Sequence, residues 1–208
     1  MNAREEVLAR IRSANASAAR PIAEVPRDYA ATGTRTPGTS EAVDLLEDRL
    51  VDYKATVTHA AAGAAAAAIA SALGTAQRVV VPPGLPVAWR PDLVECVVDD
   101  GLSAAELDRV DAAVTAATVA CAVTGTIVLD GSPDQGRRAI SLVPDRLVCV
   151  VRTDQIVETV PEMLARLEPT RPLTFISGPS ATSDIELDRV EGVHGPRTLH
   201  VVLVAAET

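Results

Sequence analysis

Two stretches near the C-terminal end of the chain bring together side chains that bind anions or transfer protons. The first, Ser177–Glu186, gathers serine, threonine and acidic residues beside Gly178. The second, Val193–Arg197, contains His194 and Gly195. Glycine-rich loops expose backbone amides that hold carboxylate or phosphate groups, and hydroxyl side chains add further donors. The two stretches together therefore predict a binding site for a small anion.

The residues of these stretches fall into two chemical classes. Asp184, Glu186 and His194 are the candidates for catalytic proton transfer, because carboxylate and imidazole groups act as general acids and bases. Two of them also fit a structural role, since Asp184 can cap a short helical turn and His194 can bond a nearby carbonyl group. The candidates for binding the ligand are Ser177, Gly178, Ser180, Thr182 and Gly195.

Two earlier loops add hydroxyl and guanidinium groups. The tripeptide Thr124-Gly125-Thr126 places two hydroxyls beside a glycine, although a β-bulge or strained turn requires the same residues. The loop Gly131–Arg138 carries two adjacent arginines, and arginine binds carboxylate or phosphate through two parallel hydrogen bonds. We expect Arg138 to hold the anion in one cleft, where the tripeptide meets the two C-terminal stretches.

Metal and cofactor motifs are missing from the sequence. It contains no G-x-S-x-G, no Walker lysine motif, no complete G-x-G-x-x-G and no H-E-x-x-H. The cysteines form no C-x-x-C pair, so neither an iron–sulfur cluster nor a structural zinc has a ligand set. We expect no metal and no cofactor. The cysteines are expected to be buried core residues, namely Cys96, Cys121 and Cys149.

Composition and charge exclude several classes of partner. The 208 residues suit one α/β domain, and the formal net charge is -9. Such an acidic protein repels nucleic acid and anionic lipid, so neither is expected as the main partner. The longest apolar run, Ala60–Ala70, is too short to span a bilayer, and no targeting signal is visible. Together with the odd number of cysteines, these features predict a cytoplasmic protein.

The chain divides into an N-terminal region, 1–39, and an α/β domain, 40–208. We expect Ala3–Ala16 to form an amphipathic helix and Ser17–Thr39, with its prolines and glycines, to form an extended arm. The helix and the arm are candidates for contacts in a homo-oligomer or with a partner protein. A loosely tethered tail is the alternative.

Within the domain, apolar strand-like runs alternate with helical patterns, which predicts an α/β fold. The expected helices are one capped by Ser40, one over Ala60–Leu73, one from Ser103 through Thr115, and one from Thr153 to Leu167. The expected strands are Lys54–Thr58, Arg78–Val81, Val94–Val98, Val119–Val123, Ile127–Asp130, Leu147–Val151, Leu173–Ile176 and Leu199–Val204. They predict one mainly parallel sheet with helices on both faces, apart from the pair flanking Gly125, which is expected to be antiparallel or bent. Ligands of such sheets bind at the carboxyl ends of the strands.

Four segments resemble the LUD-domain family, and within it the lactate-utilisation protein C type. The resemblance covers about Ser40 to Val204, and Ser177–Pro196 is its most specific part. It implies the fold shared by ribose-5-phosphate isomerase, glucosamine-6-phosphate deaminase and the CoA-transferases. The matching segments are Thr124–Leu129, Gly136–Ala139, Phe175–Glu186 and Gly192–Pro196.

The resemblance also implies a function. A protein of this type is expected to be an accessory subunit of an L-lactate utilisation system. In such a system, the subunit and iron–sulfur partner proteins together oxidise L-lactate to pyruvate. The expected ligand is a small carboxylate or a phosphorylated compound. Two alternatives remain: a free-standing isomerase, transferase or hydrolase on the same fold, and an interaction module without a ligand.

Two positions depart from the pattern of this family. Many relatives have a glutamate immediately before the T-G-T tripeptide, where this chain has Val123, and many have a histidine where it has Leu147. Each difference removes a candidate acid–base group. Both favour a binding or assembly subunit over a catalyst, and at this point the question whether the protein is an enzyme stays open.

Overall fold

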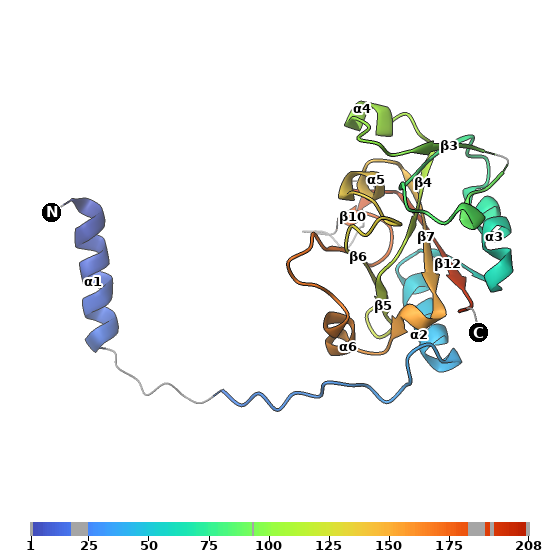
Figure 1. The fold of residues 1–208 in the computed structure, drawn as a ribbon. Coiled ribbons are helices and arrows are strands. Elements are labelled where there is room, and N and C mark those ends of the chain that lie inside the picture. The colour runs from blue at the N-terminus through green and yellow to red at the C-terminus, as the bar shows by residue number, and fades with distance from the viewer. Residues whose placement is uncertain (1, 18–24, 93, 183–189, 192–193, 207–208) are drawn as a thin grey trace. The chain divides into compact units, whose positions relative to one another are not determined.

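The computed structural model describes residues 2–17, 25–92, 94–182, 190–191 and 194–206. The chain forms two units, Met1–Ala30 and Ala31–Thr208. The first contains the expected N-terminal helix, α1 (Ala3–Ser17), whose Val7 and Ile11 side chains are about half exposed. The second contains every strand of the described chain (Figure 1). None of the described helices has the length and the apolar composition needed to cross a bilayer.

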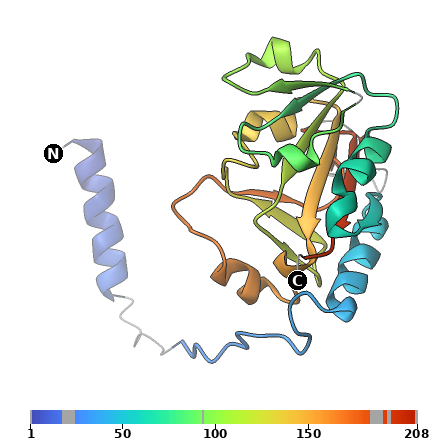
Figure 2. The same cartoon turned by 45° about the vertical axis from the view of Figure 1, so that its right-hand side comes forward.

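A six-stranded sheet forms the centre of the second unit. Every neighbouring pair of its strands is parallel, as the alternation of strands and helices predicts. In spatial order the strands are β1 (Thr56–Ala60), β12 (Thr198–Val204), β7 (Arg146–Arg152), β4 (Ala112–Ala116), β2 (Arg78–Val81) and β3 (Glu95–Val98). Figures 1 and 2 show β7 in the middle of this sheet.

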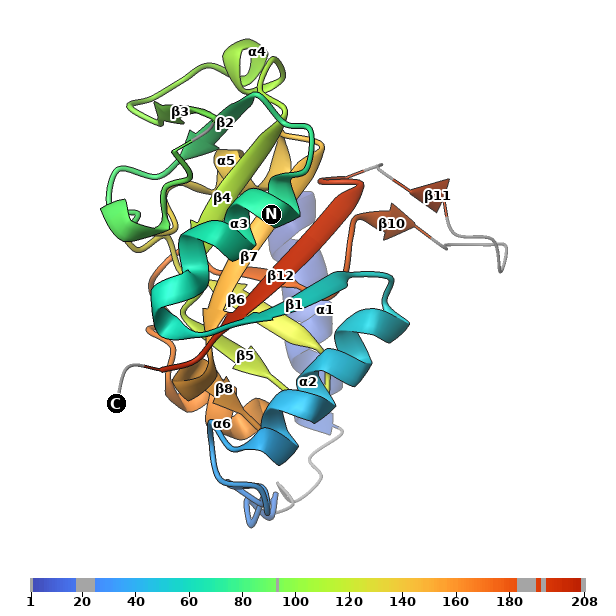
Figure 3. The same cartoon turned by 90° about the vertical axis from the view of Figure 1, so that its right-hand side faces the viewer.

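Strand β7 is apolar along its centre because both of its faces are covered. Cys149 and Val151 point into one hydrophobic cluster, whereas Val148 and Val150 point into another. On the side of the second cluster the helix α3 (Ala65–Leu73) lies across β7 and β12 (Figure 3). Alanine side chains on this helix let it lie close to the sheet. It follows a short 3-10 helix, η1 (Ala62–Ala64).

Helices and a second sheet cover the opposite face of the central sheet. Leu46 of α2 (Ser40–Asp52) and Ile140 of α5 (Arg138–Leu142) are completely buried there. Helix α6 (Val160–Ala165) packs on the second sheet through Met163. The order of this sheet is β8 (Ile156–Val157), β5 (Val119–Cys121), β6 (Thr126–Leu129) and β9 (Thr174–Ile176). Helices thus lie on both faces, as predicted, and β5 and β6 pair antiparallel on either side of Gly125.

The prediction of a single sheet is wrong, because the strands of the described chain form three. Only two residues separate the end of β4 from the start of β5. A parallel neighbour in the same sheet needs a crossover of about a dozen residues, so β5 begins a new sheet. The third sheet is the antiparallel pair β10 (Ala181–Thr182) and β11 (Val190–Glu191). Two further 3-10 helices are η2 (Val87–Trp89) and η3 (Thr153–Gln155).

The expected helix from Ser103 through Thr115 ends much earlier. Ser103 and Glu106 form the predicted capping box, but α4 spans only Ala104–Leu107. The alanine-rich run that follows becomes β4, which is buried along its whole length between β2 and β7. The Asp111 carboxylate accepts hydrogen bonds from the backbone amides of Gln77 and Arg78 and aligns the starts of the two strands. Long-range pairing therefore overrides the helical preference of alanine.

Two other helices begin later or differently than predicted. Thr39, not Ser40, is the N-cap residue of α2. The helix predicted from Thr153 is interrupted, because the β-branched pair Ile156–Val157 joins β5 as strand β8. Helix α6 then starts after Thr159, whose backbone amide donates to the Glu162 carboxylate at 2.7 Å.

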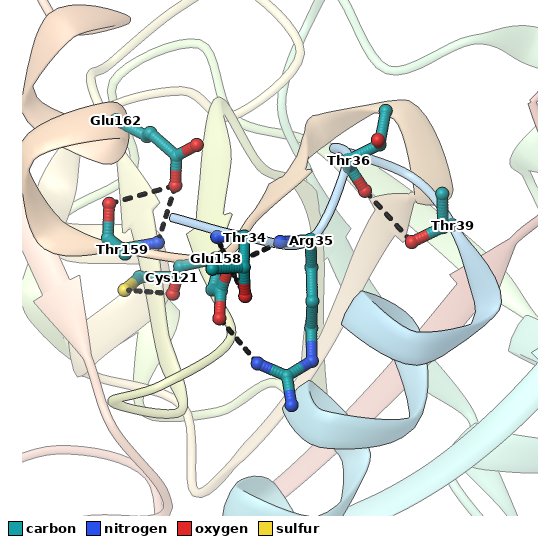
Figure 4. Close-up of polar contacts among 8 residues, drawn as sticks. All are labelled: Thr34, Arg35, Thr36, Thr39, Cys121, Glu158, Thr159 and Glu162. Carbon is teal, nitrogen blue, oxygen red and sulfur yellow. Dashed lines mark hydrogen bonds and ion pairs between the residues drawn. The ribbon is translucent and has the colours of Figure 1, made fainter. Parts of the chain in front are cut away.

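The last part of the predicted arm, Ala31–Thr39, belongs to the second unit. The side chain of Glu158 is 8% exposed and accepts hydrogen bonds from the backbone amides of Thr34 and Arg35, the latter at 2.6 Å (Figure 4). It also pairs with the guanidinium of Arg35. The hydrogen bond from the Arg35 amide is the main cause that lowers the pKa of Glu158. Glu158 thus holds this part of the arm.

Candidate functional site

Six of the candidate binding and proton-transfer residues line one cavity of about 430 Å³, here called the His194 cavity. Its lining comes from α5, β9, the loop after β9 and the segment before β12. Leu147 and Leu199, near the starts of β7 and β12, complete its wall. The six candidates that line it are Arg138, Ser177, Gly178, Ser180, His194 and Gly195.

Two backbone contacts join the predicted stretches at this cavity. The amide of Ser180 donates to the carbonyl oxygen of Pro196 at 2.8 Å. The amide of His194 donates to Oγ of Ser180 at 3.0 Å. These contacts hold the two stretches side by side in the wall of the same cavity.

The T-G-T tripeptide reaches the cavity only through a chain of hydroxyl groups. Oγ1 of Thr124 donates to Oγ1 of Thr126, and Oγ1 of Thr126 lies 2.8 Å from Oγ of Ser177. Ser177 lines the cavity, whereas Thr124, Gly125 and Thr126 do not. The tripeptide thus positions Ser177 in this structure, and it does not form the cavity wall that the sequence suggested.

The glycines of the site serve the packing of α2 more than the approach of a ligand. Gly125 has a φ of +59° and Gly178 a φ of +86°, which favour glycine. A Cβ atom would lie 2.8 Å from Cβ of Arg49 at the first position and 2.7 Å from Cβ of Tyr53 at the second. Gly195 is different, because a Cβ atom there would make only ordinary contacts.

The two adjacent arginines have different environments. Arg137 forms two hydrogen bonds with the Asp99 carboxylate, at 2.7 and 2.8 Å, and also bonds the carbonyl oxygen of Leu102. This guanidinium lowers the pKa of Asp99, whose side chain is only 3% exposed. The guanidinium of Arg138 has no hydrogen bond or ion pair with the described part of the chain, and Arg138 lines the His194 cavity. It is therefore the guanidinium available to an anion.

A second cavity, of about 500 Å³, adjoins the first and is called the Asp99 cavity. The two cavities share Arg138, Ser141 and Thr174. The Asp99 cavity lies at the carboxyl ends of β2 and β3, as the rule for parallel sheets predicts. The His194 cavity instead lies near the amino ends of β7 and β12 and beside the carboxyl end of β9.

Buried amide side chains hold the loop Gly131–Arg138 in place. Oε1 of Gln135 accepts a hydrogen bond from the Asp130 amide at 2.6 Å, and its Nε2 donates to Oγ1 of Thr118 at 2.7 Å. Asp130 also pairs with Arg171 at 2.9 Å. Because Gln135 and Asp130 are buried, the loop that carries Arg138 is preorganised.

Few groups that transfer protons face the His194 cavity. None of its described lining residues is a carboxylate, and His194 is the only imidazole. Asp184 and Glu186, the other two candidates, lie outside the described residues. Thr182 lies in β10, where only its backbone position is described. The described arrangement suits the binding of an oxyanion by one guanidinium and several hydroxyls.

Sequence reasoning missed three residues that shape the site. Thr174 lies inside β9, Leu142 inside α5 and Leu199 inside β12, and each belongs to an apolar run that looks like ordinary core. No motif marks them. The only signal in the sequence is the position of Leu199, which follows the candidate Gly195 by a few residues.

The thiols and the other polar clusters provide no second reactive centre in the described residues. Cys121 and Cys149 are completely buried, and burial raises the pKa of Cys149 to about 12. Cys96 is half-buried and its pKa is also raised by burial. Among the described residues no group of three or more histidine, cysteine or acidic side chains is placed to hold a metal ion.

Comparison with known proteins gives consistent matches. A family model described as the LUD domain matches residues 102–204. A Lactate utilization protein C from Deinococcus radiodurans is 54% identical over 170 residues, covering 79% of this chain and 80% of that protein. A protein of the same name from Bacillus subtilis is 32% identical over 109 residues, covering 47% of this chain and 44% of that protein. A crystal structure of a DUF162 family protein from Deinococcus radiodurans has a TM-score of 0.69 and 46% identity, covering 79% of this chain and 97% of that chain.

Proposed function

Since this chain belongs to the LUD domain family, we propose that it is an accessory subunit of an L-lactate utilisation system. In this proposal the oxidation of L-lactate to pyruvate takes place with iron–sulfur partner proteins, and this subunit binds a small carboxylate or a phosphorylated ligand. The names of its relatives support the lactate-utilisation role. The three free cysteines support a place in the reducing cytoplasm.

One observation carries the ligand-binding part of this proposal. Arg138 is a guanidinium without a partner in the described chain, and it lines a cavity together with Ser177, Ser180 and His194. Arginine and hydroxyl groups together bind carboxylate and phosphate oxygens.

Binding is favoured over catalysis by the wall of the cavity. Leu147, at the position where many relatives have a histidine, lines the cavity and is 1% exposed. Val123, at the position of their glutamate, is 47% exposed and does not line it. A subunit that binds a ligand and assembles with redox partners needs neither acid–base group.

Growth of the organism that carries this gene tests the proposal. Deletion of the gene is expected to slow growth on L-lactate but not on glucose. Arg138→Ala is expected to reproduce the defect, because losing one charge-assisted hydrogen bond costs about 1.5–3 kcal/mol, or roughly tenfold or more in affinity. Arg109→Ala, an exposed arginine that lines neither cavity, is the control.

Two results would contradict different parts of the proposal. Normal growth of the deletion strain on L-lactate would exclude the lactate-utilisation role. Normal growth of the Arg138→Ala strain, with a defect in the deletion strain, would exclude only the anion site. The proposed association with iron–sulfur proteins is tested by purifying the tagged protein from lactate-grown cells and measuring iron and acid-labile sulfide in the eluate.

A further inference from the structure

Arg138 stands where the His194 cavity and the Asp99 cavity meet. Ser141, one turn further along α5, and Thr174 of β9 line both cavities as well. A ligand whose anionic group binds Arg138 therefore has space to extend on either side of it. This geometry bears on the size and the chemical class of the ligand.

Each cavity is large compared with a three-carbon hydroxy acid. Their volumes are about 430 and about 500 Å³. Sites that enclose drug-sized ligands have volumes of about 300–1,000 Å³. Lactate, with one carboxylate, one hydroxyl and one methyl group, would leave most of either cavity filled with water. The space therefore favours a longer molecule.

The walls of the two cavities differ in chemistry. In the His194 cavity, Leu142, Leu147, Ile176 and Leu199 form an aliphatic wall, and the half-exposed Phe175 adds to it. The Asp99 cavity is also lined by apolar groups, but these are three prolines and the single leucine Leu129, and not a group of branched aliphatic side chains. The arginine of that cavity next to Arg138 is already neutralised by Asp99. An apolar part of the ligand thus fits the His194 cavity.

The wall also indicates which kind of apolar group fits. Five of the lining residues of the His194 cavity are leucine or isoleucine, and among the described ones only Phe175 and His194 are aromatic. Flat ring systems are usually bound by stacking on aromatic side chains, whereas alkyl chains pack well on leucine and isoleucine. An alkyl or acyl chain therefore suits this surface better than a planar base.

We propose that the ligand of this site is an amphipathic oxyanion, with its carboxylate or phosphate group on Arg138 and an alkyl or acyl chain along Leu142, Leu147 and Leu199. This inference rests on the proposed function in one respect, namely that Arg138 binds an anion. It goes further by naming the ligand class and by assigning the apolar wall as the part of the site that selects it.

Binding of two homologous series tests this inference on the full-length protein. The probes are unbranched carboxylates from acetate to octanoate and monoalkyl phosphates from methyl to hexyl, measured by isothermal titration calorimetry. Affinity is expected to rise about fourfold for each added methylene until the chain fills the cavity, because each methylene leaves water. Whichever series binds more tightly identifies the anionic group.

Three variants separate the anion from the chain. Arg138→Ala is expected to weaken every probe about tenfold or more. Leu142→Ser and Phe175→Ser are expected to flatten the dependence on chain length and to leave the shortest probe unchanged. Val87→Ser is the matched control, because Val87 is an exposed apolar residue that lines neither cavity. Circular dichroism melting curves check that each variant is folded.

Three outcomes would overturn the inference. The first is that affinity stays equal along both series. The second is that affinity depends on chain length but Leu142→Ser and Phe175→Ser leave this dependence unchanged. The third is that the wild-type protein binds none of the probes measurably. The first of these, with binding still lost in Arg138→Ala, would leave the proposed anion site intact. The proposed lactate-utilisation role is tested separately, by growth of the deletion strain on L-lactate.

Discussion

At the scale of single residues, the contrast between Arg137 and Arg138 defines the site. They are neighbours in the sequence, and both lie at the N-terminus of α5. Arg137 turns toward the almost completely buried Asp99, which it neutralises. The guanidinium of Arg138 lies beside two cavities and has no charged partner among the described residues. Substitutions of the two residues should therefore affect different properties.

Arg137→Ala is expected to lower the free energy of unfolding by about 1–2 kcal/mol at pH 7, because Asp99 loses its charged partner. This value is moderate because the Arg137 side chain is 42% exposed and solvent screens the pair. Urea unfolding followed by circular dichroism measures it. Arg109→Ala, which is exposed, should change stability by less than about 0.5 kcal/mol.

The stability that this pair contributes should depend on pH. Asp99 has a lowered pKa in the folded state, mainly because of the hydrogen bond from Arg137. The stabilisation is therefore complete above the pKa of an unfolded aspartate, near 4, and is lost as the pH falls through the lower folded value. The difference between wild type and Arg137→Ala should shrink in that acid range, and a constant difference would contradict the assignment.

At the scale of elements, Glu158 links the arm to the second sheet. It follows β8 directly, and its carboxylate binds the backbone of Thr34 and Arg35. Gly33 lies so close that a Cβ atom there would be 2.1 Å from Oε2 of Glu158. One side chain thus fixes the point from which the N-terminal segment leaves the α/β unit.

Glu158→Gln should release this part of the arm. The amide removes the charge that pairs with Arg35 and weakens the hydrogen bonds from the two backbone amides. Trypsin is then expected to cleave after Arg35 several-fold faster, as measured by mass spectrometry of the fragments over time. Glu168→Gln, at an exposed glutamate, should leave the rate unchanged, and an equal rate in Glu158→Gln would exclude the anchoring role.

At the scale of the whole molecule, the covered parallel sheet controls access to the thiols. Cys149 lies in β7 at the centre of the sheet, and Cys121 lies between the second sheet and α6. Cys96 is half-buried. Because thiolates and not thiols react, burial protects all three groups in the folded protein, and the raised pKa values of Cys96 and Cys149 protect those two further.

Native protein treated with an aqueous disulfide reagent at pH 8 is expected to label Cys96 at most. Cys121 and Cys149 should react only when the whole domain unfolds, so their labelling should follow the urea transition. Spectrophotometric counting of released thiolate, with peptide mapping of the labelled cysteines, measures both. Rapid labelling of all three in the absence of urea would contradict the described packing.

Much of the architecture could be predicted because it is encoded locally. The continuous apolar runs at β2, β7 and β12 predict strands buried on both faces, and all three lie in the central sheet. The glycine-rich loops around Ser177 and Gly195 predict a shared hollow, and both line the His194 cavity. Each of these features depends on residues that are close together in the sequence.

The α/β class and the parallel central sheet could be predicted from the sequence alone, because the periodicity of apolar residues records burial along the chain. Three features required the folded structure: Ala112–Ala116 is a strand, α2 occupies the space beside Gly125 and Gly178, and the Arg138 guanidinium has no partner among the described residues. These outcomes depend on contacts between distant residues, such as Asp99 with Arg137. A single sequence does not record which distant partners meet, so only their position in space settles which charge is neutralised and which is left to bind a ligand.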